Sequence, residues 1–122
     1  MEVEFYCSAG GENYVGSFID SLLDKKAAKK IIRRLESVEE HGISILTHSG
    51  TMRKIHNYRN GIFEIKIDFN NVFYRITYVI RAGTCWLLSI FAKKDNKTPL
   101  QQIRTALQRA KDLDLSLGLA LN

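Results

Sequence analysis

Three short runs of strand-like sequence between Gly61 and Lys97 constrain the fold more than any other part of the chain. The first, Ile62 to Phe69, alternates apolar and charged residues, which is typical of a strand with one buried face. The second, Val72 to Arg81, is rich in β-branched and aromatic residues. The third, Cys85 to Ala92, is almost entirely apolar, as in a strand covered on both faces. The sequence therefore predicts a three-stranded meander.

The first turn of this meander places two like charges opposite each other. Asn70-Asn71 fits a two-residue hairpin turn, because asparagine tolerates the positive φ that such a turn requires. Counting back from the turn pairs Lys66 with Arg75 and puts Glu64 on the same face. Like charges directly across a strand pair are normally destabilising. A bound anion, or sharing of the cations by neighbouring carboxylates, would explain the pair.

The second turn leaves two registers open. A two-residue turn places Ile90 opposite Arg75, whereas a three-residue turn places Phe91 there. We favour the three-residue turn, which also pairs Lys93 with Phe73. In either register we expect exposed charges at the centre of the sheet, and this face is where we look for function.

A lysine-rich segment follows the third run and leads into a helix. Thr98 fits the N-cap, Pro99 fits the first helical position, and Gln101 completes a capping box. Free N–H groups and the positive end of the helix dipole favour an anion at such a terminus. We therefore expect a phosphate-binding corner, formed by Thr98 with Lys93, Lys94 and Lys97.

The remaining segments complete an α+β chain. Residues 2–6 alternate like a strand, helical stripes cover Val15 to Leu22 and Ala28 to Val38, and a third helix follows Thr98. We expect a mainly antiparallel twisted sheet, with the first two helices on one face and the charged groove on the other. The tail, residues 114–122, stays unassigned.

The composition indicates one basic domain spanning residues 1–122. The chain has 45% hydrophobic residues, and its 18 Lys and Arg exceed its 13 Asp and Glu, which favours an anionic partner such as nucleic acid. Cys7 and Cys85 lack a CxxC spacing, so we expect free thiols. No signal peptide or membrane span is visible, and we expect a cytoplasmic protein.

The second helix carries a row of cations on its exposed side. This row is either a solvated helix face or a strip that tracks a nucleic-acid backbone. Its members are Lys25, Lys26, Lys29, Lys30, Arg33 and Arg34.

Four segments, in this order of elements, carry a resemblance to a known group of proteins. They are Glu39 to Gly42, Gly61 to Lys66, Phe73 to Tyr78, and Phe91 to Pro99. Together they resemble the phage-derived HigB-like branch of the RelE/ParE toxin superfamily, over residues 3 to about 113. The resemblance implies a RelE-like fold, a type II toxin–antitoxin toxin and a helix-turn-helix, HigA-like antitoxin. Its RelE and HigB branches cut mRNA on the ribosome, and its ParE branch inhibits DNA gyrase.

The resemblance also implies site residues. Arg75 matches the strand arginine that RelE-type toxins use against the scissile phosphate, Lys66 matches a lysine of the preceding strand, and Lys94 falls at a second functional arginine. Glu64 stands where RelE has another lysine, and the RelE tyrosine after the basic cluster has no clear counterpart. Cleavage by the RNA 2′-hydroxyl requires no metal, and we expect no cofactor.

The chemistry of RNA cleavage suggests roles for these side chains. Attack by the 2′-hydroxyl needs a base, cations that stabilise the phosphorane, and an acid for the leaving 5′-oxygen. Glu64 is the candidate base, Arg75 the phosphate stabiliser, and Lys66 or Lys94 the acid. Phe73 offers a stacking surface for a base. The resemblance also makes His56 a candidate, because some HigB toxins employ a histidine. The three histidines lack the spacing of metal ligands.

Other interpretations remain open. Glu64 and Lys66 could be solvent-facing strand residues paired with Arg75 and Asp68. The chain could inhibit gyrase without enzymatic activity, or act as an inactive basic binding module.

Overall fold

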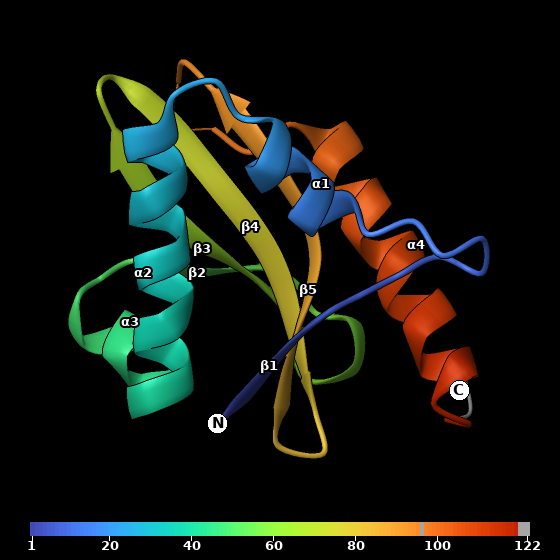
Figure 1. Cartoon of the computed structure of the whole chain (residues 1–122). Coiled ribbons are helices and arrows are strands. Elements are labelled where there is room, and N and C mark those ends of the chain that lie inside the picture. The colour runs from blue at the N-terminus through green and yellow to red at the C-terminus, as the bar shows by residue number, and fades with distance from the viewer. Residues whose placement is uncertain (96, 120–122) are drawn as a thin grey trace.

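The computed structural model describes residues 1–95 and 97–119, which form a five-stranded sheet in the order β1-β5-β4-β3-β2 (Figure 1). β1 runs parallel to β5, and the other neighbouring pairs are antiparallel. This arrangement confirms the α+β class. The strands are β1 (Glu2–Phe5), β2 (Met52–His56), β3 (Ile62–Phe69), β4 (Val72–Arg81) and β5 (Thr84–Lys93).

Helices cover both faces of this sheet. Figure 1 shows α2 and α3 on one side of the strands and α4 on the other. Asn13 and Asp24 cap α1 and α2 through side-chain hydrogen bonds, and Gly42 ends α2 with a φ of 79°. The bounds are α1 (Tyr14–Ser21), α2 (Lys25–His41), α3 (Ser44–His48) and α4 (Leu100–Ser116), with a 3₁₀ turn at Tyr58–Asn60.

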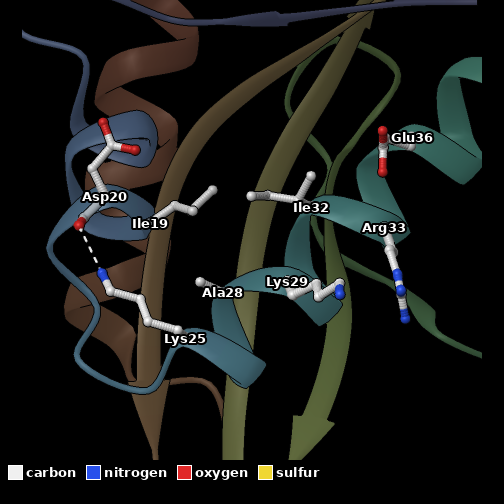
Figure 2. Close-up of a pocket in the computed structure, with 8 residues that line it drawn as sticks. All are labelled: Ile19, Asp20, Lys25, Ala28, Lys29, Ile32, Arg33 and Glu36. Atoms are coloured by element: carbon white, nitrogen blue, oxygen red, sulfur yellow. Dashed lines mark hydrogen bonds between the residues drawn. The ribbon is translucent and has the colours of Figure 1, made fainter.

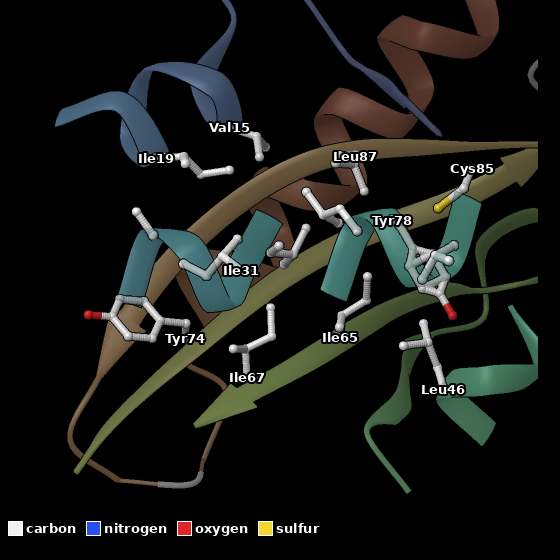
Figure 3. Packing of buried hydrophobic residues seen from close by; sticks show 14 of the residues in the cluster. Val15, Ile19, Ile31, Leu46, Ile65, Ile67, Tyr74, Tyr78, Cys85 and Leu87 are labelled. Carbon is white, nitrogen blue, oxygen red and sulfur yellow. The ribbon is translucent and has the colours of Figure 1, made fainter. Parts of the chain in front are cut away.

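The main core lies between the sheet and helices α1, α2 and α3 (Figure 3). The apolar stripe of α2 supplies Ile31, Leu35 and Val38, which meet Ile65 and Ile67 of β3 in this core. Complete burial of one such side chain contributes about 1.5–3 kcal/mol. The alternation of apolar and charged residues along β3 thus determines which face of the strand packs against the helices.

A second, smaller core lies under α4. Ile62, Val79 and Leu88 of the sheet pack with Ala106 and Ala110 of the helix, and all five are fully buried. α4 covers only part of its face. The charged residues of β3 and β4 lie on the remainder of the same face.

The β3–β4 register is confirmed. Lys66 pairs with Arg75, and Asn70 and Asn71 form the turn with φ values of 53° and 65°. For β5, Phe91 lies opposite Arg75 and Lys93 opposite Phe73, as the favoured register predicted.

The prediction of a three-residue turn between β4 and β5 is wrong. Arg81 pairs with Thr84, so the turn has two residues. The offset comes instead from a bulge at Leu88, because Tyr78 pairs with Leu87 while Thr77 pairs with Ser89. Arg109 of α4 donates a 2.9 Å hydrogen bond to the Leu88 carbonyl oxygen.

Part of the cationic row on α2 is used internally. Arg34 Nη1 donates a 3.0 Å hydrogen bond to the Lys66 carbonyl oxygen, and Lys30 Nζ donates to the carbonyl oxygen of Asp68. β2 pairs with β3 as far as Ile65, and the Lys66 N–H still donates to the Thr51 carbonyl oxygen, so the two side chains cover the strand edge beyond that point. The other four cations of the row are exposed, and both interpretations of the row stay open for them.

Cys7 is exposed, Cys85 is buried, and both are free thiols, as expected. Within the described residues, no helix combines the length and apolar character needed to cross a membrane. Leu115, Leu117 and Leu119 of the leucine-rich tail are exposed, and the last three residues of the tail, 120–122, lie outside the described residues.

Candidate functional site

The centre of the charged face is the carboxylate of Glu64, which β3 places beneath the surface with no exposure to solvent. Its Oε1 lies 2.8 Å from Nη2 of Arg53 and 4.0 Å from Nε of Arg75. Its Oε2 accepts a 2.8 Å hydrogen bond from the hydroxyl of Thr98. A buried carboxylate is strongly unfavourable unless it is paired in this way. Side chains from β2, from β4 and from the segment before α4 therefore meet at the Glu64 carboxylate of β3.

Arg75 lies beside Glu64 and is also fully buried. Its Nη1 donates 2.8 Å and 2.9 Å hydrogen bonds to Asp68 Oδ1 and to the carbonyl oxygen of Tyr74. The Phe73 ring centroid is 5.4 Å from the guanidinium carbon, a distance suited to a cation–π contact. Asp68 itself is 58% exposed. Asp68 thus stands between Arg75 and solvent.

The expectation of exposed charge at this position is wrong for Glu64 and Arg75. Both side chains have zero solvent exposure, because the paired groups of β2, β3 and the Thr98 segment enclose them. The interpretation of Glu64 as a solvent-facing strand residue fails for the same reason. Asp68 pairs with Arg75 at 2.8 Å, so a neighbouring carboxylate shares this cation, which is one of the two explanations offered for the facing charges.

Arg53 of β2 is the site residue that the sequence did not indicate. It lies opposite Glu64 in the β2–β3 register, and its side chain is 40% exposed. A cation that is bound to a buried carboxylate and still reaches solvent can contact an external anion. A 3₁₀ turn separates the two strands, and their register shifts between Lys54 and His56 within β2. Counting residues could therefore not have paired Arg53 with Glu64.

Lys93 brings a further cation to Glu64 from β5. Its Nζ is buried, with no hydrogen-bond partner among the described residues. Burial lowers the pKa of the Lys93 ammonium, an effect that the nearby Glu64 carboxylate opposes. A buried ammonium beside two guanidinium groups favours the approach of an anion.

Thr98 does not act as the predicted N-cap. α4 begins at Leu100, Pro99 occupies the cap position, and within the described residues no side chain makes the cap hydrogen bond. The Thr98 hydroxyl instead donates to Glu64 and accepts from Arg53. The buried Glu64 carboxylate needs a hydrogen-bond donor, and this contact outweighs the preference of Thr98 to cap the helix.

The other predicted site residues lie at different depths. Lys66 and Phe73 are half-buried on the charged face, and Lys94 and Lys97 are exposed after β5. His56 takes a local role, because its Nδ1 accepts a 3.0 Å hydrogen bond from the Tyr58 backbone. In the described part of the chain, no three His, Cys, Asp or Glu side chains are grouped as metal ligands.

A second buried ionic cluster fastens the end of α4. Asp114 is fully buried and accepts hydrogen bonds from Arg81 Nε at 2.7 Å and Tyr58 Oη at 2.7 Å. Burial alone would raise the pKa of Asp114, but these donors hold it below its usual value. This contact could not be predicted from the sequence, since the partners of Asp114 come from two distant segments, β4 and the 3₁₀ turn.

A groove on the opposite side of the molecule takes no part in this site. Figure 2 shows it between α1 and α2, with Ile19 and Ile32 projecting toward it and Lys25 bonded to the Asp20 carbonyl oxygen at 3.3 Å. Its volume is about 480 Å³.

Residues 18–111 match the model of a protein family described as phage-derived protein, Gp49-like. The matched part is well over half of the 122 residues. The chain belongs to this family. The match spans all the residues around Glu64, whereas Asp114 lies beyond it in this Gp49-like protein. A comparison with curated proteins found no match.

Proposed function

We propose that this Gp49-like protein is the toxin of a type II toxin–antitoxin pair and that it cleaves mRNA on the ribosome. The observation that carries the proposal is the convergence of Arg53, Arg75 and Lys93, from three strands, on Glu64. Preorganised cations of this kind suit the charge that develops on a phosphorane. The sequence resemblance and the Gp49-like family membership support the same assignment.

The phosphate is proposed to bind between Arg53 and Arg75. Arg53 is partly exposed, and the exposed carboxylate of Asp68 already occupies Nη1 of Arg75 at 2.8 Å. An RNA phosphate carries the same charge as this carboxylate and can replace it as the partner of Arg75. Lys66, directly opposite Arg75, and the exposed Lys97 would add further charge along the RNA backbone.

Glu64 is proposed as the base once Arg53 turns toward the phosphate. In this structure Oε1 faces Arg53 and Oε2 accepts from Thr98, so a proton acceptor becomes available when one partner leaves. The 2′-oxygen then attacks phosphorus, its proton passes to Glu64, and the 5′-oxygen leaves with a proton from an ammonium group. Lys93, with its lowered pKa, joins Lys66 and Lys94 as a candidate for that acid. The products would be a 2′,3′-cyclic phosphate and a free 5′-hydroxyl.

The partner is proposed to be a helix-turn-helix, HigA-like antitoxin encoded beside this chain, acting in the cytoplasm where the ribosomes are. Induced expression, with RNA 5′ ends and DNA supercoiling mapped in the same cells, tests the activity. New RNA 5′ ends within codons, with unchanged supercoiling, are the expected result. Altered supercoiling with intact mRNA would replace the proposal with gyrase inhibition.

A further inference from the structure

A pocket of about 300 Å³ lies between β2 and the start of α4, next to the Glu64 site. Arg53 forms a wall common to both, since it contacts Glu64 and also lines the pocket. Anything bound in this pocket therefore lies beside the phosphate position proposed above. The lining residues are Arg53, Lys54, Ile55, Lys97, Thr98 and Ile103.

The lining combines positive charge with an apolar surface. Lys54 and Lys97 are exposed cations, and none of the described lining residues is acidic. Ile55 of β2 and Ile103 of α4 supply the apolar part. The volume is at the lower end of the range for small-molecule sites, about 300–1,000 Å³. These properties suit one nucleotide, which has an anionic phosphate and a flat base with an apolar face.

The side chains of the lining also favour one kind of base. Lys54, Lys97 and Arg53 only donate hydrogen bonds, and the Thr98 hydroxyl already donates to Glu64. Guanine presents two adjacent acceptors, O6 and N7, which are the usual partners of lysine and arginine. Adenine and cytosine present an amino group at the corresponding edge and would place a donor against these cations, and uracil presents a single acceptor there, O4, in place of the two of guanine.

We propose that this pocket binds a single guanine nucleotide of the RNA, adjacent to the phosphate held at Glu64. Its phosphate contacts Arg53 and Lys97, and its base lies against Ile55 and Ile103. The proposal rests on the proposed function, and it assigns the sequence preference of that activity to residues of β2 and α4.

Direct binding to the purified protein tests the pocket without requiring cleavage. The probes are guanosine, adenosine and cytidine 5′-monophosphates and inorganic phosphate, titrated against ¹⁵N-labelled protein. We expect guanosine monophosphate to bind at least about fivefold more tightly than the other three, as one good base contact allows. The largest chemical-shift changes should fall at Ile55, Lys97 and Ile103.

Matched variants locate the binding. Ile103→Ala removes the apolar surface contributed by α4, whereas Leu100→Ala shortens a 60% exposed leucine on the same helix that does not line the pocket. Ile103→Ala should abolish the preference for guanosine monophosphate over inorganic phosphate, and Leu100→Ala should retain it. If Ile103→Ala unfolds the protein, the exposed Lys54→Gln provides the same comparison.

The outcomes separate the two proposals. The guanine-pocket proposal is overturned if guanosine monophosphate binds no more tightly than inorganic phosphate. It is also overturned if the affinity for guanosine monophosphate is unchanged in Ile103→Ala and Lys54→Gln. Specific binding by a protein that cleaves no RNA overturns the proposed function and leaves the pocket standing. RNA cleavage with no preference for guanine beside the cut site overturns the guanine-pocket proposal and leaves the proposed function standing.

Discussion

The hydroxyl of Thr98, two residues before α4, donates a 2.8 Å hydrogen bond to Oε2 of Glu64 in β3. Both side chains are buried, so this bond ties the start of the helix to the centre of the charged face. A residue that the sequence assigns to helix capping is thereby part of the candidate site. Its removal should affect both stability and function.

The first prediction concerns this bond. Thr98→Val keeps the shape of the side chain but leaves the Glu64 carboxylate without one donor. We expect the free energy of unfolding to fall by about 1–3 kcal/mol. Urea denaturation measures it, with Thr98→Ser as the variant that keeps the hydroxyl and the exposed Thr47→Val as the control. Equal stability of Thr98→Val and wild type would show that the bond contributes nothing.

Arg75→Ala should reduce stability as well as toxicity. Removing one member of a buried ionic group leaves its partner uncompensated, at a cost of about 3–5 kcal/mol. Denaturation at neutral pH gives the stability, and growth after induction gives the toxicity. Arg33→Ala, which removes an exposed arginine of α2, serves as the control. A folded and fully toxic Arg75→Ala protein would contradict the role proposed for this residue.

Glu64→Gln separates a base from a positioning residue. Glutamine keeps the size of the side chain and loses its basicity, so single-turnover cleavage should fall by roughly 10²-fold or more if Glu64 accepts the 2′-proton. RNA affinity should change little. The assay uses ribosomes programmed with a defined A-site codon at saturating protein, with the exposed Glu36→Gln as control. Cleavage at the wild-type rate would remove Glu64 from the proton transfer.

Asp68→Asn should strengthen RNA binding. The Asp68 carboxylate, which is 58% exposed, competes with a phosphate for Nη1 of the buried Arg75, and we expect their pair to contribute about 1 kcal/mol because solvent screens the Asp68 side. Loss of that competition corresponds to about a fivefold gain in affinity. Asp20→Asn, which removes the same charge from α1, should leave affinity nearly unchanged. Equal effects of the two substitutions would mean that only net charge matters.

Lys93→Met should stabilise the protein at neutral pH while weakening RNA binding. Burial lowers the pKa of Lys93 from its ordinary 10.5, so below the lowered pKa the folded state holds an unfavourable charge. The unfolded chain binds more protons between the lowered pKa and 10.5, and the wild-type protein therefore gains stability as pH rises through that window. Thermal unfolding at several pH values should show this gain in wild type and its absence in Lys93→Met. A destabilised Lys93→Met protein would contradict the pKa direction.

The sequence predicts this fold well where local chemistry determines it. The Asn70-Asn71 turn fixes the β3–β4 register, and the spacing of apolar residues fixes the helices. Prediction from the sequence fails where a side chain's position depends on a partner from another segment of the chain. Arg53 contacts Glu64 from the neighbouring strand β2, and Thr98 contacts it from a segment 34 positions away. No periodic pattern encodes either contact. The burial of Glu64 and Arg75 could not be predicted, because alternation identifies a face and not what covers it.

The bulge at Leu88 shifts the register of β5 against β4 by one residue. Without Leu88, Leu87 and Ser89 could still pair with Tyr78 and Thr77, and the cross-strand neighbours of the site would be preserved. The second core would lose a buried leucine, and Arg109 would lose the carbonyl oxygen it binds. The extra residue Leu88 therefore attaches α4 to the sheet and leaves the cross-strand neighbours of the site unchanged. The contacts that hold α4 and the geometry of the site can thus vary independently along β5.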